Sequence, residues 1–118
     1  MIFGNYSKDN LIHKLEKEPD IFWKFRAPNS GDEIAMERFM RRKPTTSEIL
    51  IHELALTFEE TNMGAEEMGE PYLDKELPFD IIFDRIQEMP YELLLELSGK
   101  LALIAKGWGS SNKEAEQE

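Results

Sequence analysis

The chain has 118 residues and a formal net charge of −10, with 41% hydrophobic and 32% charged residues. This size and composition are typical of one soluble globular domain and exclude an intrinsically disordered chain. No apolar stretch approaches the ~20 residues that a membrane span needs, so we expect no membrane partner. The start of the sequence lacks a signal-peptide pattern. Because there is no cysteine, disulfides and thiolate metal sites are excluded, which fits a reducing cytoplasmic location.

The negative charge is confined to the second half of the chain. Residues 1–58 carry nine acidic and nine basic side chains, whereas residues 59–118 carry fifteen acidic and five basic ones. Such a field repels phosphate, so we expect no direct binding of nucleic acid. The one basic cluster consists of Arg38, Arg41, Arg42 and Lys43. It either complements the carboxyl end of a helix or forms a docking patch for an acidic partner or a neighbouring copy.

The first predicted elements are one helix and one strand. Capping at Ser7 or Asp9 predicts a helix that ends at about Glu18, because a proline follows. Alternating apolar and basic side chains then predict a half-buried strand near residues 21–26. An isolated strand leaves backbone groups unpaired, so we expect it to pair with Ile2–Phe3 or across a dimer.

Two capping boxes mark the next helices. Ser30, with Glu33 three residues later, predicts the start of a second helix. Thr45 with Glu48 predicts the start of a third, which continues to about Asn62. Each box directly follows a turn or a proline, as helix starts commonly do.

A long segment separates these helices from the last two. Residues 63–77 contain two glycines, a proline and many acids without a period, which predicts a loop. A fourth helix begins at about Pro78 and a fifth at Pro90, each with apolar side chains at helical spacing. Lys106–Gly107 predicts the end of the fifth helix.

Together these elements predict a mainly α fold. We expect about five helices in a small single-domain bundle over residues 1–108, with one short strand. Residues 109–118 are small, polar and charged, and they predict a flexible C-terminal tail.

Catalytic chemistry finds little support in the sequence. His13 and His52 each stand alone in their predicted helices, without a second histidine at metal-binding spacing. The pairs Glu59–Glu60 and Glu66–Glu67 do not have the ligand spacing of a calcium loop. Because a nucleophile, a base and a metal motif are all missing, we predict no enzyme activity, no metal and no cofactor.

Apolar side chains exceed what one helix stripe needs. In the last two helices Ile81, Leu95, Leu103 and Trp108 fall off the best apolar stripe. Earlier in the chain, adaptable Met40 shares a face with Phe39. Two interpretations remain open: a fully internal core, or a surface that binds an apolar helix or a second copy.

One segment resembles a known family. Residues 22–28 read Phe-Trp-Lys-Phe-Arg-Ala-Pro, and residues 31–35 read Gly-Asp-Glu-Ile-Ala. This segment, residues 22–35, resembles the N-terminal segment of bacteriophage tail assembly chaperones, in which a strand carries F-x-F-R-x-P and a G-D-E turn opens a helix. The resemblance implies a protein of the host cytoplasm that self-associates, binds the helical tape measure protein and helps tail tube proteins to assemble around it. It also implies a longer product made by frameshifting.

The sequence therefore predicts a non-enzymatic phage tail assembly chaperone that binds an apolar helical partner and forms homo-oligomers. The alternative is an acidic inhibitor that mimics nucleic acid and blocks a basic groove of a host protein. For the chaperone, the predicted partner-binding residues are Trp23, Phe25, Arg26, Phe39, Met40, Leu95, Leu103 and Trp108.

Overall fold

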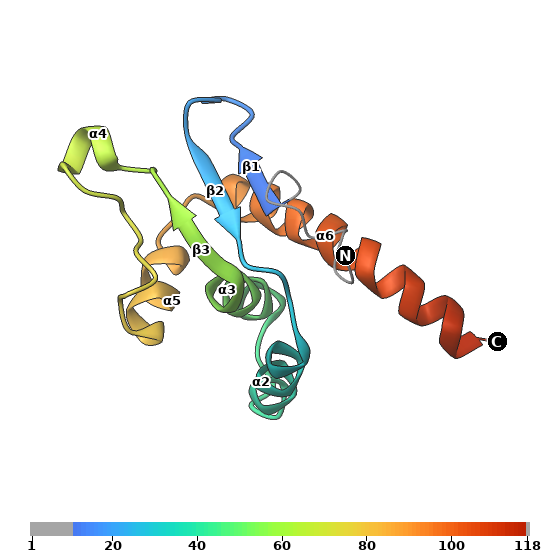
Figure 1. Cartoon of the computed structure of the whole chain (residues 1–118). Helices are drawn as coiled ribbons and strands as arrows, with labels where there is room; N and C mark the ends of the chain where they lie inside the picture. Colours follow the sequence, from blue (N-terminus) through green and yellow to red (C-terminus); the bar gives the residue numbers. More distant parts are fainter. Residues whose placement is uncertain (1–10, 118) are drawn as a thin grey trace.

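A computed structural model describes the backbone of residues 11–117 and the side chains of residues 11–104. This part of the chain contains five helices and a small three-stranded antiparallel sheet (Figure 1). The prediction of a mainly α chain is confirmed at this level. The prediction of a single strand is wrong, because two further strands pair with the predicted one.

The sheet has the order β1–β2–β3, with β1 at Ile12–Lys14, β2 at Phe22–Phe25 and β3 at Phe58–Thr61. Trp23 of β2 lies opposite His13 on one side and opposite Thr61 on the other. Strands of the same chain therefore occupy both edges of β2, so the pairing across a dimer that the sequence suggested is not observed. The other suggested partner, Ile2–Phe3, lies outside the described residues.

Two helix predictions are corrected by this sheet. The predicted first helix runs to Glu18, but residues 12–14 form β1, and residues before 11 lie outside the described part. The predicted third helix runs to Asn62, but α3 covers Thr46–Thr57 and the chain then extends into β3. In both places pairing with β2 outweighs the local helical spacing.

Helix α3 begins as predicted, whereas the N-cap residue of α2 lies one position earlier than predicted. Thr45 and Glu48 form the reciprocal capping box of α3. The box of α2, which covers Ser30–Met40, is formed by Asn29 and Asp32 and not by Ser30 and Glu33. Asparagine and serine are equally favourable N-cap residues, so the observed capping box lies one residue before the predicted one in the same turn.

The remaining helices follow the predicted order. The segment predicted as a loop contains the short helix α4, Ala65–Met68, between two glycines. Helix α5 covers Phe79–Gln87 after Pro78, as predicted. Helix α6 covers Tyr91–Gln117 and passes the predicted stop at Lys106–Gly107. The division into a domain and a flexible tail stays a prediction.

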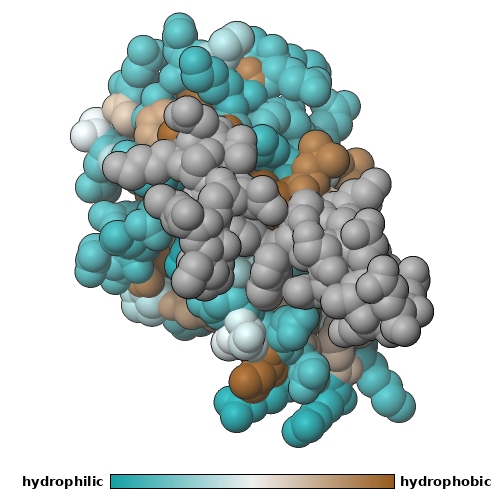
Figure 2. Space-filling view, turned by 45° about the vertical axis from the view of Figure 1, so that its right-hand side comes forward, coloured by the Kyte–Doolittle hydropathy of each residue, from teal (hydrophilic) through white to brown (hydrophobic). Residues whose placement is uncertain are grey.

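One face of the molecule is mostly hydrophilic outside the grey atoms (Figure 2). On the face in view in Figure 2, outside the grey atoms, hydrophobic side chains form only separate small patches. Within the described residues no helix is both long enough and apolar enough to cross a membrane.

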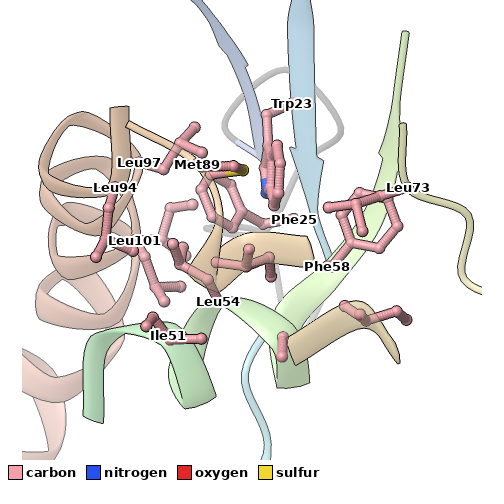
Figure 3. Packing of buried hydrophobic residues seen from close by; sticks show 14 of the residues in the cluster. Trp23, Phe25, Ile51, Leu54, Phe58, Leu73, Met89, Leu94, Leu97 and Leu101 are labelled. Carbon is pink, nitrogen blue, oxygen red and sulfur yellow. The ribbon is translucent and has the colours of Figure 1, made fainter. Parts of the chain in front are cut away.

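The core lies where the sheet meets α3 and α6. Trp23 and Phe25 alternate on one face of β2 and are 1% and 0% exposed. They pack between Leu54 of α3 and the leucines of α6, with Leu73 on the far side (Figure 3). Side-chain alternation along β2 therefore places both aromatic rings inside, as the strand pattern predicts. Helix α3 is central, since it contacts α2, α5 and α6.

Candidate functional site

Helix α6 has one face in the core and an unusual opposite face. The inward face consists of Leu94, Leu97, Leu101 and Ile104, all buried. The outward face consists of Tyr91, Glu92, Leu95, Gly99, Ala102 and Leu103, all exposed. A helix face toward water is normally rich in charge, yet only one residue of this set is charged. We call this set the α6 outer face.

The apolar side chains of the α6 outer face form a row. Tyr91, Leu95, Gly99 and Leu103 are each four residues apart, which places them along one ridge of the helix. Tyr91, Leu95 and Leu103 are 58%, 46% and 66% exposed. A Cβ at Gly99 would meet no atom within 4 Å. The ridge therefore has a gap at Gly99 where another backbone can approach closely.

Polar contacts hold α6 against β1 and the turn that follows. His13 Nε2 lies 2.5 Å from Glu96 Oε2, and the Glu16 backbone N–H donates to the same oxygen at 3.1 Å. An exposed pair joins Lys17 Nζ and Glu92 Oε2 at 3.4 Å. These contacts, with the buried leucines, fix the rotation of α6 and thereby the direction of its outer face.

Three predicted partner-binding residues have internal roles. Trp23 and Phe25 are core residues, so the folded chain does not offer them to a partner. Arg26 Nη2 donates to Asp32 Oδ1 at 2.6 Å and to the Leu56 carbonyl at 2.6 Å. Arg26 therefore joins β2, the start of α2 and the end of α3. The expectation of a surface position is thus wrong for Trp23 and Phe25, whereas partner binding by Arg26, whose side chain is 34% exposed, stays a prediction.

The other five predicted residues fall into separate places. Leu95 and Leu103 share the α6 outer face, while the Trp108 side chain lies outside the described residues. On α2, Met40 is 47% exposed and Phe39 is half-buried against α3. Figure 1 places α2 beyond α3, at the edge of the molecule. The predicted residues of α2 and α6 therefore do not form one surface.

Three residues that complete the α6 outer face were not predicted from the sequence: Tyr91, Gly99 and Ala102. For Tyr91 and Gly99 the signal was present in the spacing of four that begins at Tyr91, directly after Pro90, whereas Ala102 lies outside this series. It was hidden because a glycine, an alanine and a first-turn tyrosine do not stand out in an apolar count. Only the position of the core identifies this face as outward.

The histidine and glutamates considered as catalytic or metal-binding candidates lie in three different settings. His52 lies on α3 beside Phe39, and burial, followed by the charge of Arg42, lowers the pKa of its imidazole. Glu59 accepts from Lys75 Nζ at 2.9 Å, while Glu66 and Glu67 are exposed on α4. Among the described residues, no three histidine, aspartate or glutamate side chains are grouped so that they could hold a metal ion.

Comparisons with protein family models, with curated proteins and with solved structures gave no match to this chain. The candidate site therefore rests on the geometry of α6.

Proposed function

We propose that this protein is a non-enzymatic assembly chaperone that holds an apolar helical segment of a partner on the α6 outer face. The observation that carries the proposal is the exposed row of Tyr91, Leu95 and Leu103 with a gap at Gly99. The short resemblance at residues 22–35 supports a phage tail assembly chaperone, whose client is the tape measure protein. We place its action in the host cytoplasm.

The row has the spacing that a helical client needs. Side chains four apart form a ridge, and a second helix packs its own ridges on either side of it. Burial of each exposed leucine contributes about 1.5–3 kcal/mol at full burial, so a few such contacts hold a client reversibly. The net charge of −10 keeps the loaded complex soluble, which is the other property that a chaperone requires.

Self-association follows from the same face. In the absence of a client, the α6 outer face of one copy covers that of another, with the gaps at Gly99 allowing close approach. Client and second copy then compete for one surface. Addition of client is expected to dissociate the oligomer.

The test replaces Leu95 or Leu103 with glutamate. The purified variants are compared by light scattering and by binding to a synthetic amphipathic helix with leucine and alanine on one face and glutamine on the other. Each change should weaken association and client binding about tenfold or more while helix content by circular dichroism stays unchanged.

Ile34→Glu is the matched control, because Ile34 is 51% exposed on α2, away from the α6 outer face. It should leave both measurements unchanged. The proposal is wrong if all three variants behave alike, or if the wild-type protein is a monomer that does not bind the synthetic helix.

A further inference from the structure

A groove of about 390 Å³ lies among α2, α3 and α5, separate from the α6 outer face. Its apolar part is lined by Ala35, Phe39 and Phe79, with the ring of His52 between the two phenylalanines. Two guanidinium groups, those of Arg38 and Arg42, also line it. The groove thus combines an aromatic floor with two positive charges.

The aromatic floor is ordered by stacking. The rings of Phe39 and His52 are parallel within 3°, with centroids 4.0 Å apart. Phe79 lies edge-on to His52 at 5.1 Å and is itself 41% exposed. Burial lowers the pKa of His52, so its ring is neutral at neutral pH and adds to the apolar floor. An inserted apolar side chain would meet aromatic carbon on two sides.

The two arginines lack acidic partners in the part of the chain that the structure describes. There, Lys17, Arg26 and Lys75 each lie within 4 Å of a carboxylate. No such contact is present for Arg38 or Arg42, although the chain has ten more negative than positive charges. Both side chains are exposed at the groove. Among the described residues, no carboxylate oxygen thus lies within 4 Å of the two guanidinium groups that flank this apolar floor.

We propose that this groove binds an acidic peptide segment of a partner protein. An aromatic or aliphatic side chain of that segment lies on the aromatic floor of Phe39, His52 and Phe79. Carboxylates beside it pair with Arg38 and Arg42. The arginines fix the position of the segment, because guanidinium and carboxylate match in geometry as well as in charge. The aromatic floor adds an apolar contact, so the groove should bind such a segment more tightly than an acidic segment without an apolar side chain.

The acidic peptide fits better than a nucleic acid. A strand of nucleic acid brings a phosphate at every nucleotide, and the overall charge of −10 opposes a long phosphate chain. A short peptide brings only a few carboxylates, and it also brings the apolar side chain that the aromatic floor requires. The inference does not depend on the proposed function, because α2 and α6 present different surfaces.

The test uses a synthetic amidated peptide with one phenylalanine flanked on each side by two glutamates. Its affinity for the full chain is measured by fluorescence anisotropy at low and at physiological salt. Arg38→Gln with Arg42→Gln should weaken binding about tenfold at low salt, less when salt is raised. The matched control is Arg41→Gln with Lys43→Gln, which removes the same charge beside the groove and should change affinity less than twofold.

Two further probes complete the test. A peptide with serine in place of phenylalanine should bind about tenfold more weakly than the phenylalanine peptide. A pentathymidylate, whose four phosphates equal the four glutamates in number, should bind more weakly than either. The proposal is overturned if the two double variants lose affinity equally, if the serine peptide binds as well, or if the oligonucleotide binds best. Leu95→Glu should bind the phenylalanine peptide normally, so failure here is separable from failure at the α6 outer face.

Discussion

The guanidinium of Arg26 holds the carboxylate of Asp32 across the turn between β2 and α2, with 2.6 Å between Nη2 and Oδ1. The same nitrogen donates to the Leu56 carbonyl near the end of α3. Asp32 in turn accepts from the backbone N–H of Asn29 and so caps α2. One arginine therefore connects a strand, a helix start and a helix end.

This connection predicts a large effect of Arg26→Ala on stability. The Asp32 side chain is only 14% exposed and would lose its ionic partner. The Leu56 carbonyl would lose the hydrogen bond that Arg26 donates. The free energy of unfolding should fall by about 2–3 kcal/mol, as measured by urea denaturation. Lys24→Ala on the same strand should cost less than about 1 kcal/mol, because no ion pair of Lys24 occurs among the described residues. Equal losses would contradict a linking role for Arg26.

The same contacts explain the segment that resembles phage chaperones. Phe25 fills the core, Arg26 holds Asp32, and Asp32 caps α2. In this chain the segment thus forms a strand–turn–helix unit, and these three residues serve its folding. Local chemistry of this kind was readable in the sequence, since caps and alternation depend on neighbours a few residues apart.

What the sequence did not reveal depends on distant pairing. Residues 12–14 and 58–61 have apolar spacing that suits a helix, and only their hydrogen bonds to β2 make them strands. The α6 outer face was equally hidden, because its identity depends on which side of α6 meets Trp23 and Phe25. Non-local contacts of this kind leave no local signature.

A second prediction concerns His13 and Glu96, which join β1 to α6. Alanine at either position should destabilise the fold, more so for Glu96, because its carboxylate also accepts the Glu16 N–H. A double-mutant cycle should give a coupling energy of about 1–2 kcal/mol. The exposed pair of Lys17 and Glu92 is the control, with a coupling below about 0.5 kcal/mol. The His13→Ala variant should bind the client normally. A folded His13→Ala variant that no longer binds the client would contradict a purely structural role for His13.

The two glycines around α4 provide a third prediction. Gly64 and Gly69 have φ values of 82° and 79°, so alanine is strained at both. A Cβ at Gly64 would also lie 3.2 Å from Tyr72 Cβ, whereas at Gly69 it would meet nothing within 4 Å. Gly69→Ala should cost about 1–2 kcal/mol and Gly64→Ala more, as measured by thermal denaturation. The reverse order would show that crowding at Tyr72 does not matter.

A fourth prediction follows from His52. Burial, and then the charge of Arg42, lowers the pKa of this imidazole in the folded protein. Well above pH 6.5, the ordinary pKa of histidine, the ring is neutral whether the chain is folded or not, so it gives no pH dependence there. As the pH falls below about 6.5, the unfolded chain takes up a proton that the folded protein resists, and stability decreases.

Urea denaturation at pH 7.5 and at pH 5 measures this effect. His52→Phe keeps a planar ring beside Phe39 and removes the proton, so its stability should fall less between the two pH values than that of the wild type. Burial raises the pKa of Glu53, which acts in the opposite direction, but this residue is present in both proteins and its effect cancels. Identical changes in the two proteins would refute the assignment.

The last prediction separates a chaperone from a nucleic-acid mimic. Glutamine at Glu66, Glu67 and Glu70 with asparagine at Asp74 removes four of the ten net negative charges, all from exposed side chains. If the acids serve mainly to keep a loaded chaperone in solution, the precipitation midpoint in ammonium sulfate should fall. Affinity for the helical client should then change less than about threefold at physiological salt, since exposed charges far from the contact are screened.

A mimic would behave differently, because its carboxylates stand in for phosphates and contact the basic groove directly. The neutralised variant would then lose its partner by a large factor that shrinks as salt is raised, while client binding at Leu95 and Leu103 would be absent from the start.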